Sequence, residues 1–77
     1  MVIGVCMVNV VPGEEKSVYN SLKGIEGVRD LFHVFGEYDF VAIIEVDGLS
    51  ALNKTVDIIR EVRGVTSTKT IVGAELG

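Results

Sequence analysis

The sequence predicts an α+β domain in which two helices cover one face of a four-stranded antiparallel sheet. Three observations lead to this prediction: strand-like apolar runs alternate with helix-like apolar stripes, glycines stand at the boundaries, and the two halves repeat one pattern. In the repeat, Leu22 matches Ile59 and Gly27 matches Gly64. Each half therefore reads strand, helix, strand. Right-handed crossovers make a βαββαβ sandwich with antiparallel strand order 4-1-3-2 the simplest arrangement.

The first half begins with an apolar run, residues 2–11, that predicts a strand. Pro12-Gly13 marks the entry to a helix over about residues 14–23, and Gly24 or Gly27 can end it. A second strand follows over residues 28–35. The helix buries one narrow apolar stripe, which consists of Val18, Leu22 and Ile25.

The second half repeats this order with a strand over residues 38–46, a helix over about 50–63 and a strand over 65–72. Ser50 is placed to cap the helix, and Gly64 is placed to stop it. Its apolar stripe consists of Leu52, Val56, Ile59 and Val62. Each helix is therefore expected to pack against the sheet with only one of its sides.

The first and third strands are apolar on both faces, which two helices cannot cover. In the first strand Val5 and Met7 alternate with Cys6 and Val8, and all four are apolar or weakly polar. Burying one large apolar side chain contributes about 1.5–3 kcal/mol, so a contact that buries several contributes about as much free energy as the whole stability of a small domain. We therefore expect the second face to be covered by another copy, in an obligate homodimer.

Length and composition limit the functional classes. The chain has 77 residues, which predicts a single domain over residues 1–77, and its net charge of −4 with scattered basic residues disfavours direct binding of nucleic acid. The N-terminal apolar run lacks a basic leader, and no run reaches the roughly 18 residues of a membrane span. One cysteine and one histidine supply no zinc site. We expect a cytoplasmic protein that has no cofactor or metal and that does not itself bind a membrane.

The turn at Gly36-Glu37-Tyr38-Asp39 is the main candidate site, because it places a carboxylate and an aromatic ring where two apolar runs meet. A carboxylate such as Asp39 can bind an ammonium group, and the glycine lets a ligand approach the backbone. In the alternative interpretation the turn only closes a hairpin, Tyr38 packs at a rim and Asp39 caps a backbone amide.

Taken together, the turn, the apolar strand after it with Glu45 and Asp47, and the final segment Gly64–Val72 resemble the C-terminal effector-binding (RAM) domain of the Lrp/AsnC, or feast/famine, regulators. The resemblance covers essentially the whole chain. It implies a ferredoxin-like subunit that pairs through its sheet into a dimeric α/β barrel, with dimers forming a ring, commonly an octamer or a decamer. It also implies a stand-alone form without the family's helix-turn-helix, and so no operator binding of its own.

The same resemblance implies that free amino acids bind in a cleft between dimers. The residues that would line this cleft are Gly36, Glu37, Tyr38, Asp39, Thr66, Ser67, Thr68 and Thr70. Thr and Ser hydroxyls suit the ligand's carboxylate. The leading hypothesis is therefore an amino-acid-binding regulatory module, not an enzyme, whose partners include full-length Lrp/AsnC regulators or a transporter for the same metabolite.

Two other functional classes stay open. A small monooxygenase or isomerase with a similar dimeric barrel could use His33 as a base or a ligand, although a lone strand histidine is more often structural. A pure assembly adaptor would bind no small molecule. Glu45 and Asp47 could bind a metal or mark a strand end, and Cys6 among apolar residues is expected to be an unreactive core side chain.

Overall fold

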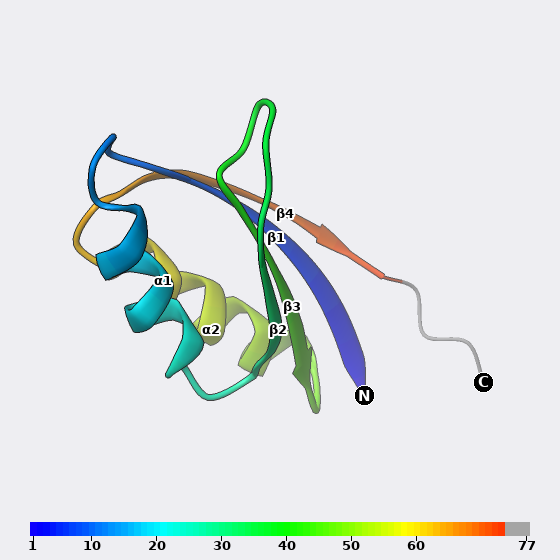
Figure 1. Ribbon diagram of the computed structural model, residues 1–77. Coiled ribbons are helices and arrows are strands. Elements are labelled where there is room, and N and C mark those ends of the chain that lie inside the picture. Colours follow the sequence, from blue (N-terminus) through cyan, green and yellow to red (C-terminus); the bar gives the residue numbers. More distant parts are fainter. Residues whose placement is uncertain (74–77) are drawn as a thin grey trace.

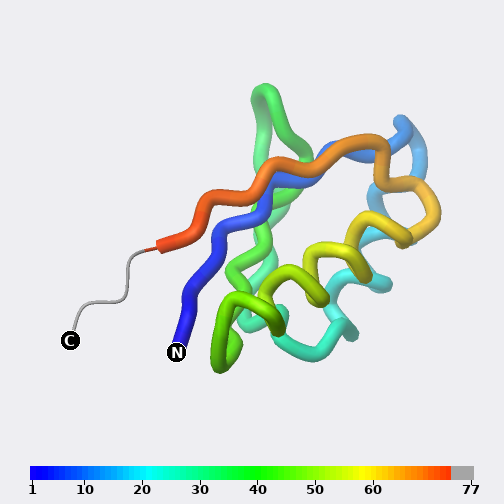
Figure 2. The backbone as a smooth tube through the Cα atoms, turned by 180° about the vertical axis from the view of Figure 1, so that it is seen from behind, coloured from blue at the N-terminus to red at the C-terminus, as the bar shows by residue number. Residues whose placement is uncertain are grey.

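Four strands and two helices follow one another in the predicted order. The computed structural model describes residues 1–73 and contains β1 (Val2–Val10), α1 (Glu15–Lys23), β2 (Val28–His33), β3 (Phe40–Val46), α2 (Leu49–Glu61) and β4 (Val65–Val72). Figures 1 and 2 show both helices on the same side of the sheet. Residues 74–77 of the predicted domain lie outside the described part.

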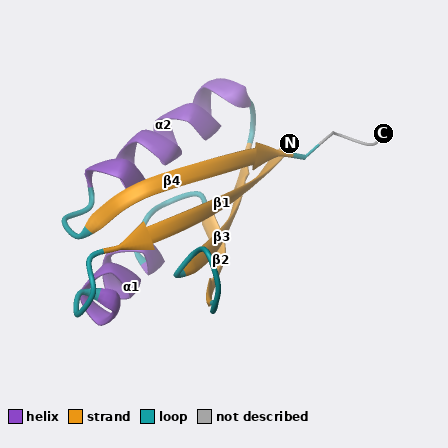
Figure 3. Cartoon of the chain, turned by 90° about the horizontal axis from the view of Figure 1, so that it is seen from above, coloured by secondary structure: helices purple, strands orange, loops and turns teal. Residues whose placement is uncertain are grey.

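The strands are ordered β2-β3-β1-β4, and all neighbours are antiparallel. This is the predicted order 4-1-3-2 read from the other edge, so the ferredoxin-like α+β prediction is confirmed. Figure 3 shows β4 beside β1, with β3 and β2 beyond them. The register Val8↔Phe40 and Cys6↔Ala42 aligns the two central strands so that their buried residues share the helix side.

The core lies between this sheet face and the helices. It consists of Cys6, Val8, Val10, Val18, Leu22, Phe40, Ala42, Ile44, Leu52, Val56 and Ile59. The predicted helix stripes supply Val18 and Leu22 from α1, and α2 buries Thr55 besides its apolar residues. Helix α2 approaches β1 closely at Gly4, where an added Cβ would lie 2.6 Å from Leu52 Cδ1.

The opposite sheet face is uncovered among residues 1–73, as the shortage of helices predicted. Phe32 and Ile71 on this face are each 53% exposed. The side chains of the central strands that point the same way are only half-buried; they are Ile3, Val5, Met7, Val41 and Ile43. We call this surface the open face.

The start of α2 differs from its prediction. The helix begins at Leu49 with Gly48 as its N-cap residue, so Ser50 lies inside the first turn and the predicted Ser50 cap is wrong. The Leu52 N–H donates to the Gly48 carbonyl at 3.0 Å, so the hydrogen bonds of the helix begin at Gly48, before Ser50 is reached. Helix α2 ends at Glu61, and Gly64, with φ +102°, then redirects the chain into β4.

Neither helix of residues 1–73 is long and apolar enough to cross a membrane. Helix α1 has 9 residues and α2 has 13. Each buries one apolar side, which is the pattern of helices that cover a sheet; the outer side is mostly polar, although α2 also exposes Leu49 and Ile58.

Candidate functional site

The loop between β2 and β3 projects from the body of the domain as an arm (Figure 1). At its tip Gly36 has φ +130°, and an added Cβ there would meet no atom within 4 Å. Glu37 is exposed, Tyr38 and Asp39 are half-buried, and Phe35 is 96% exposed. Phe35 is the most exposed of the large apolar side chains of residues 1–73.

Asp39 fastens this arm to β1. Its Oδ2 accepts a hydrogen bond from the Val10 N–H at 2.8 Å, and its own N–H donates to the Val8 carbonyl at 2.9 Å. The Val34 N–H donates to the Asp39 carbonyl, also at 2.9 Å. Asp39 therefore caps a backbone amide, as the alternative interpretation of the sequence predicted. Among residues 1–73 the second carboxylate oxygen, Oδ1, keeps its capacity to accept a bond.

The four predicted site residues of β4 do not share one face. Thr68 and Thr70 pair with Val8 and Cys6, so they point toward the helices. Ser67 pairs with Asn9 on the open face, where Asn9 Nδ2 donates to Ser67 Oγ at 3.3 Å. Thr66 lies at the register shift between Asn9 and Val10, where the pairing skips it. One subunit therefore presents these hydroxyls in two directions.

A shallow cleft of about 380 Å³ brings three of the predicted residues together beside α2. It is lined by Arg60, Val65, Thr66, Ser67 and Thr68. Arg60 Nε donates to Thr68 Oγ1 at 2.9 Å, which holds the guanidinium against the outer edge of the sheet. Among residues 1–73 the nearest carboxylate oxygen, on Asp57, is 3.9 Å from Arg60 Nη1. We call this site the Arg60 cleft.

The Arg60 cleft has the chemistry of a carboxylate site. A guanidinium offers five N–H donors and binds carboxylates in a bidentate manner, and only Nε is used by Thr68. As an edge strand, β4 also turns unpaired backbone groups outward. Arg60 is an exposed residue in the last turn of α2, where a basic side chain also suits the negative end of the helix. The indication in the sequence that Arg60 belongs to this cleft was its position about one turn before the Thr-rich strand.

Cys6 lies near this cleft but inside the core, with no exposed surface. Burial raises the pKa of the Cys6 thiol, and this effect outweighs the lowering by the Thr70 hydroxyl and the Arg60 charge. The thiol is thus held in its neutral form. This agrees with the prediction that Cys6 serves as a small core side chain.

We expect Cys6 in the folded protein to react with a disulfide reagent such as DTNB at pH 8 roughly 100-fold more slowly than in the unfolded chain, because reaction requires opening of the core. Because the folded-state pKa is raised, the stability from the neutral thiol is complete below the ordinary thiol pKa and is lost as pH rises above it. Thiol-labelling kinetics test the first statement. Equal labelling rates with and without denaturant would contradict it.

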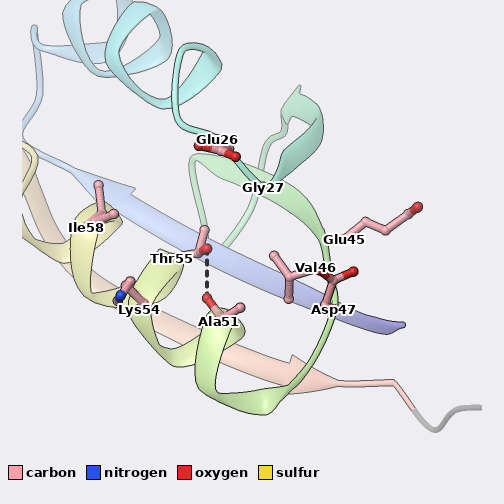
Figure 4. A pocket seen from close by; sticks show the side chains of 9 residues that line it. All are labelled: Glu26, Gly27, Glu45, Val46, Asp47, Ala51, Lys54, Thr55 and Ile58. Atoms are coloured by element: carbon pink, nitrogen blue, oxygen red, sulfur yellow. Dashed lines mark hydrogen bonds between the residues drawn. The ribbon is translucent and has the colours of Figure 1, made fainter.

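A second cleft, of about 420 Å³, lies at the end of β3 remote from the arm (Figure 4). It is lined by Glu26, Gly27, Glu45, Val46, Asp47, Ala51, Lys54, Thr55 and Ile58. Glu45 Oε2 already binds Arg29 at 2.6 Å, and Thr55 Oγ1 donates to the Ala51 carbonyl. Within residues 1–73 no group of three or more His, Cys, Asp or Glu side chains is arranged to hold a metal ion.

His33 lies on the helix side of β2, where its ring stacks on Phe40 with centroids 4.8 Å apart. The centroid of the Phe35 ring lies 5.7 Å from the centroid of the His33 ring. A hollow of about 340 Å³ beside it is lined by Glu15, Lys16, Tyr19, His33 and Phe40. His33 is exposed and packs one side of its ring on the buried Phe40, which is a structural role for this histidine.

Comparison with known proteins gives a consistent result. Residues 4–74 match the family model described as the Lrp/AsnC ligand binding domain. A transcriptional regulator of the helix-turn-helix type, LysM of Sulfurisphaera tokodaii, is 35% identical over 48 residues, which is 62% of this chain and 34% of the regulator. The chain thus spans about a third of that regulator's length.

Two further similarities concern an enzyme and a solved structure. Homocitrate synthase of Sulfolobus acidocaldarius is 39% identical over 54 residues, which is 70% of this chain but only 12% of the enzyme. The crystal structure of FFRP-DM1 superposes with a TM-score of 0.91 at 27% identity, covering 96% of this chain and 100% of that one. Fold and family model therefore agree over nearly the whole chain.

Proposed function

Because this chain belongs to the family of Lrp/AsnC ligand-binding domains, we propose that it is a regulatory module that binds a free amino acid and transmits its presence to other proteins through assembly. The family match over residues 4–74 is the observation that carries this proposal. In this role the module catalyses no reaction itself.

The two kinds of curated relative support a regulatory role. The similar stretch forms part of a DNA-binding regulator in one case and of a synthase in the other. A segment shared by proteins with such different activities cannot supply the chemistry of both, but it can supply control of both. Our proposal places full-length regulators of the family, and enzymes that carry a similar segment, among the partners.

Assembly is the second element of the proposal. The open face exposes apolar side chains that no element of residues 1–73 covers, and a second copy would bury them in a sheet-to-sheet homodimer. By the family resemblance, dimers associate further into a ring of eight or ten subunits. The exposed Phe35 on the arm is suited to this second contact.

The proposed ligand site combines the arm with the Arg60 cleft. The ligand's carboxylate would bind Arg60 and the hydroxyls of Thr66 and Ser67, and its ammonium group would bind Asp39 Oδ1. In one subunit strand β1 lies between Asp39 and Ser67. By the family resemblance the ligand cleft lies between dimers, so two subunits would contribute to one site.

The test is a thermal-shift panel of the twenty L-amino acids on the wild type and on Arg60→Gln and Asp39→Asn. Asn at position 39 keeps an oxygen for the Val10 N–H while it removes the charge, so the arm should stay attached. A ligand at one hundred times its dissociation constant is expected to stabilise the wild type by about 2.7 kcal/mol per site. We expect both variants to lose most of this shift.

The matched control is Arg63→Gln, which removes one exposed arginine beyond the end of α2 and outside the Arg60 cleft. It should respond to ligand as the wild type does. An unchanged shift in Arg60→Gln would remove that residue from the site. Flat melting curves across all twenty amino acids would instead favour the assembly adaptor.

A further inference from the structure

We propose that the hollow beside His33 is a second ligand site, which binds a small molecule with a planar heteroaromatic ring that carries an N–H group. It lies on the helix side of β2, at one edge of the sheet, whereas the Arg60 cleft lies at the β4 edge. All of its lining residues come from one subunit. The inference therefore goes beyond the proposed amino-acid site and does not depend on the dimer.

Three aromatic rings form the base and the walls of this hollow. Phe40, which is 1% exposed, is the base. The His33 ring lies 4.8 Å from it, centroid to centroid, at an interplanar angle of 27°, and the Tyr19 ring lies 6.0 Å from it at 41°. His33 is exposed and Tyr19 is half-buried, so both walls keep surface that a ligand can contact. Aromatic pairs prefer such offset or tilted geometries, and a bound planar ring would extend the cluster.

The size and the lining of the hollow fit a small molecule. Its volume of about 340 Å³ is at the lower end of the range of ligand pockets, roughly 300–1,000 Å³. Such pockets are lined mainly by apolar and aromatic side chains, with a few polar groups that orient the ligand. Here α1 supplies the polar groups, Glu15 and Lys16, beside the three rings.

Glu15 provides the hydrogen-bond acceptor that selects the ring. Its Oε1 accepts a hydrogen bond from the Gly13 N–H at 2.8 Å, which fixes the carboxylate in the first turn of α1. Glu15 forms no ion pair with residues 1–73, so Oε2 keeps its capacity to accept a bond. A hydrogen bond to a charged acceptor is stronger than one between neutral groups, so a ring with an N–H, such as indole, is favoured over a plain benzene ring.

The probe for this site is N-acetyl-L-tryptophanamide, and its fluorescence anisotropy measures binding. The chain contains no tryptophan, so the indole fluorescence comes from the probe alone. The probe carries the indole N–H but neither the free ammonium nor the free carboxylate that the proposed amino-acid site requires. We expect saturable binding with a dissociation constant of about 0.1–1 mM, which is usual for a ligand of this size.

A second probe isolates the hydrogen bond. The analogue methylated at the indole nitrogen has the same ring but no N–H, so it should bind the wild type roughly fivefold more weakly. In Glu15→Gln one side-chain oxygen remains for the Gly13 N–H, but the second acceptor becomes an amide donor. The two probes should therefore bind this variant with nearly equal affinity.

The walls are tested by Tyr19→Leu and His33→Leu, each of which removes a ring and keeps an apolar side chain. Each should weaken binding of N-acetyl-L-tryptophanamide about fivefold. Phe32→Leu is the matched control, because it removes a ring from the same strand on the open face, outside the hollow. It should change the dissociation constant by less than about twofold. The comparison of the two probes on the wild type covers the case in which a wall variant does not fold.

The proposal is overturned if N-acetyl-L-tryptophanamide shows no saturable binding at millimolar protein, if both probes bind the wild type equally, or if Phe32→Leu weakens binding as much as His33→Leu. Binding of free amino acids without binding of this probe would overturn the second site and leave the proposed function standing. Binding of the probe without any response to free amino acids would do the reverse, so the two failures are distinguishable.

Discussion

Replacing Phe40 with alanine is expected to lower the free energy of unfolding by about 3–5 kcal/mol, which approaches the whole stability of many small domains. Phe40 is 1% exposed and is the largest fully buried side chain of residues 1–73. Its ring contacts His33 at a centroid distance of 4.8 Å and Tyr19 at 6.0 Å. Alanine would leave a cavity where β3 meets α1, because the surrounding backbone is held by the sheet.

Urea denaturation followed by circular dichroism, at one fixed protein concentration, measures this loss. The concentration must be fixed because any dimer couples stability to mass action. Leu49→Ala is the control: shortening an apolar side chain that is 59% exposed on the helix layer should alter stability by less than about 0.5 kcal/mol. Similar losses in the two variants would contradict the packing described here.

Gly4→Ala is expected to destabilise the domain by about 1–3 kcal/mol, although alanine normally suits a strand better than glycine does. The added Cβ would lie 2.6 Å from Leu52 Cδ1, so α2 or the Leu52 side chain must move. Leu52 is itself 1% exposed, and its neighbours leave it little room to move. The steric cost should therefore exceed the gain in backbone entropy.

A double-mutant cycle tests the stated cause. In a Leu52→Ala background the methyl group at position 4 meets no δ carbon, so Gly4→Ala should cost markedly less than in the wild type. Gly24→Ala is the control, because its Cβ would approach only backbone oxygens at 3.9 and 4.0 Å. Equal costs of Gly4→Ala in both backgrounds would show that Leu52 is not the obstacle.

The fold was largely predictable because local periodicity reflects the side on which each element is buried. Runs with apolar residues on both faces predicted β1 and β3 as central strands, and stripes such as Val18 and Leu22 predicted the buried sides of the helices. Helix boundaries were less predictable. The start of α2 is set by the hydrogen bond from the Leu52 N–H to the Gly48 carbonyl, and a capping type of residue at Ser50 does not determine where that first bond forms.

The candidate site was predictable only in part, because its geometry depends on contacts between distant segments. The carboxylate of Asp39 accepts a hydrogen bond from the Val10 N–H, which is 29 residues away in the chain. Arg60 belongs to the cleft only because Thr68, on the neighbouring strand, holds its guanidinium. Such contacts need both partners to be placed, and no local pattern contains that information.

By itself, the sequence determined the order of the elements, the two-sided apolar strands and hence an uncovered face, since these follow from residue patterns a few positions long. The tertiary structure alone decided which hydroxyls of β4 point to the helices and which to the open face, because that depends on the register with β1. It likewise decided that Lys69 and the Arg29–Asp30–Glu45 group lie at opposite edges of one surface. Strand pairing, which joins residues far apart in the chain, is the physical reason for the difference.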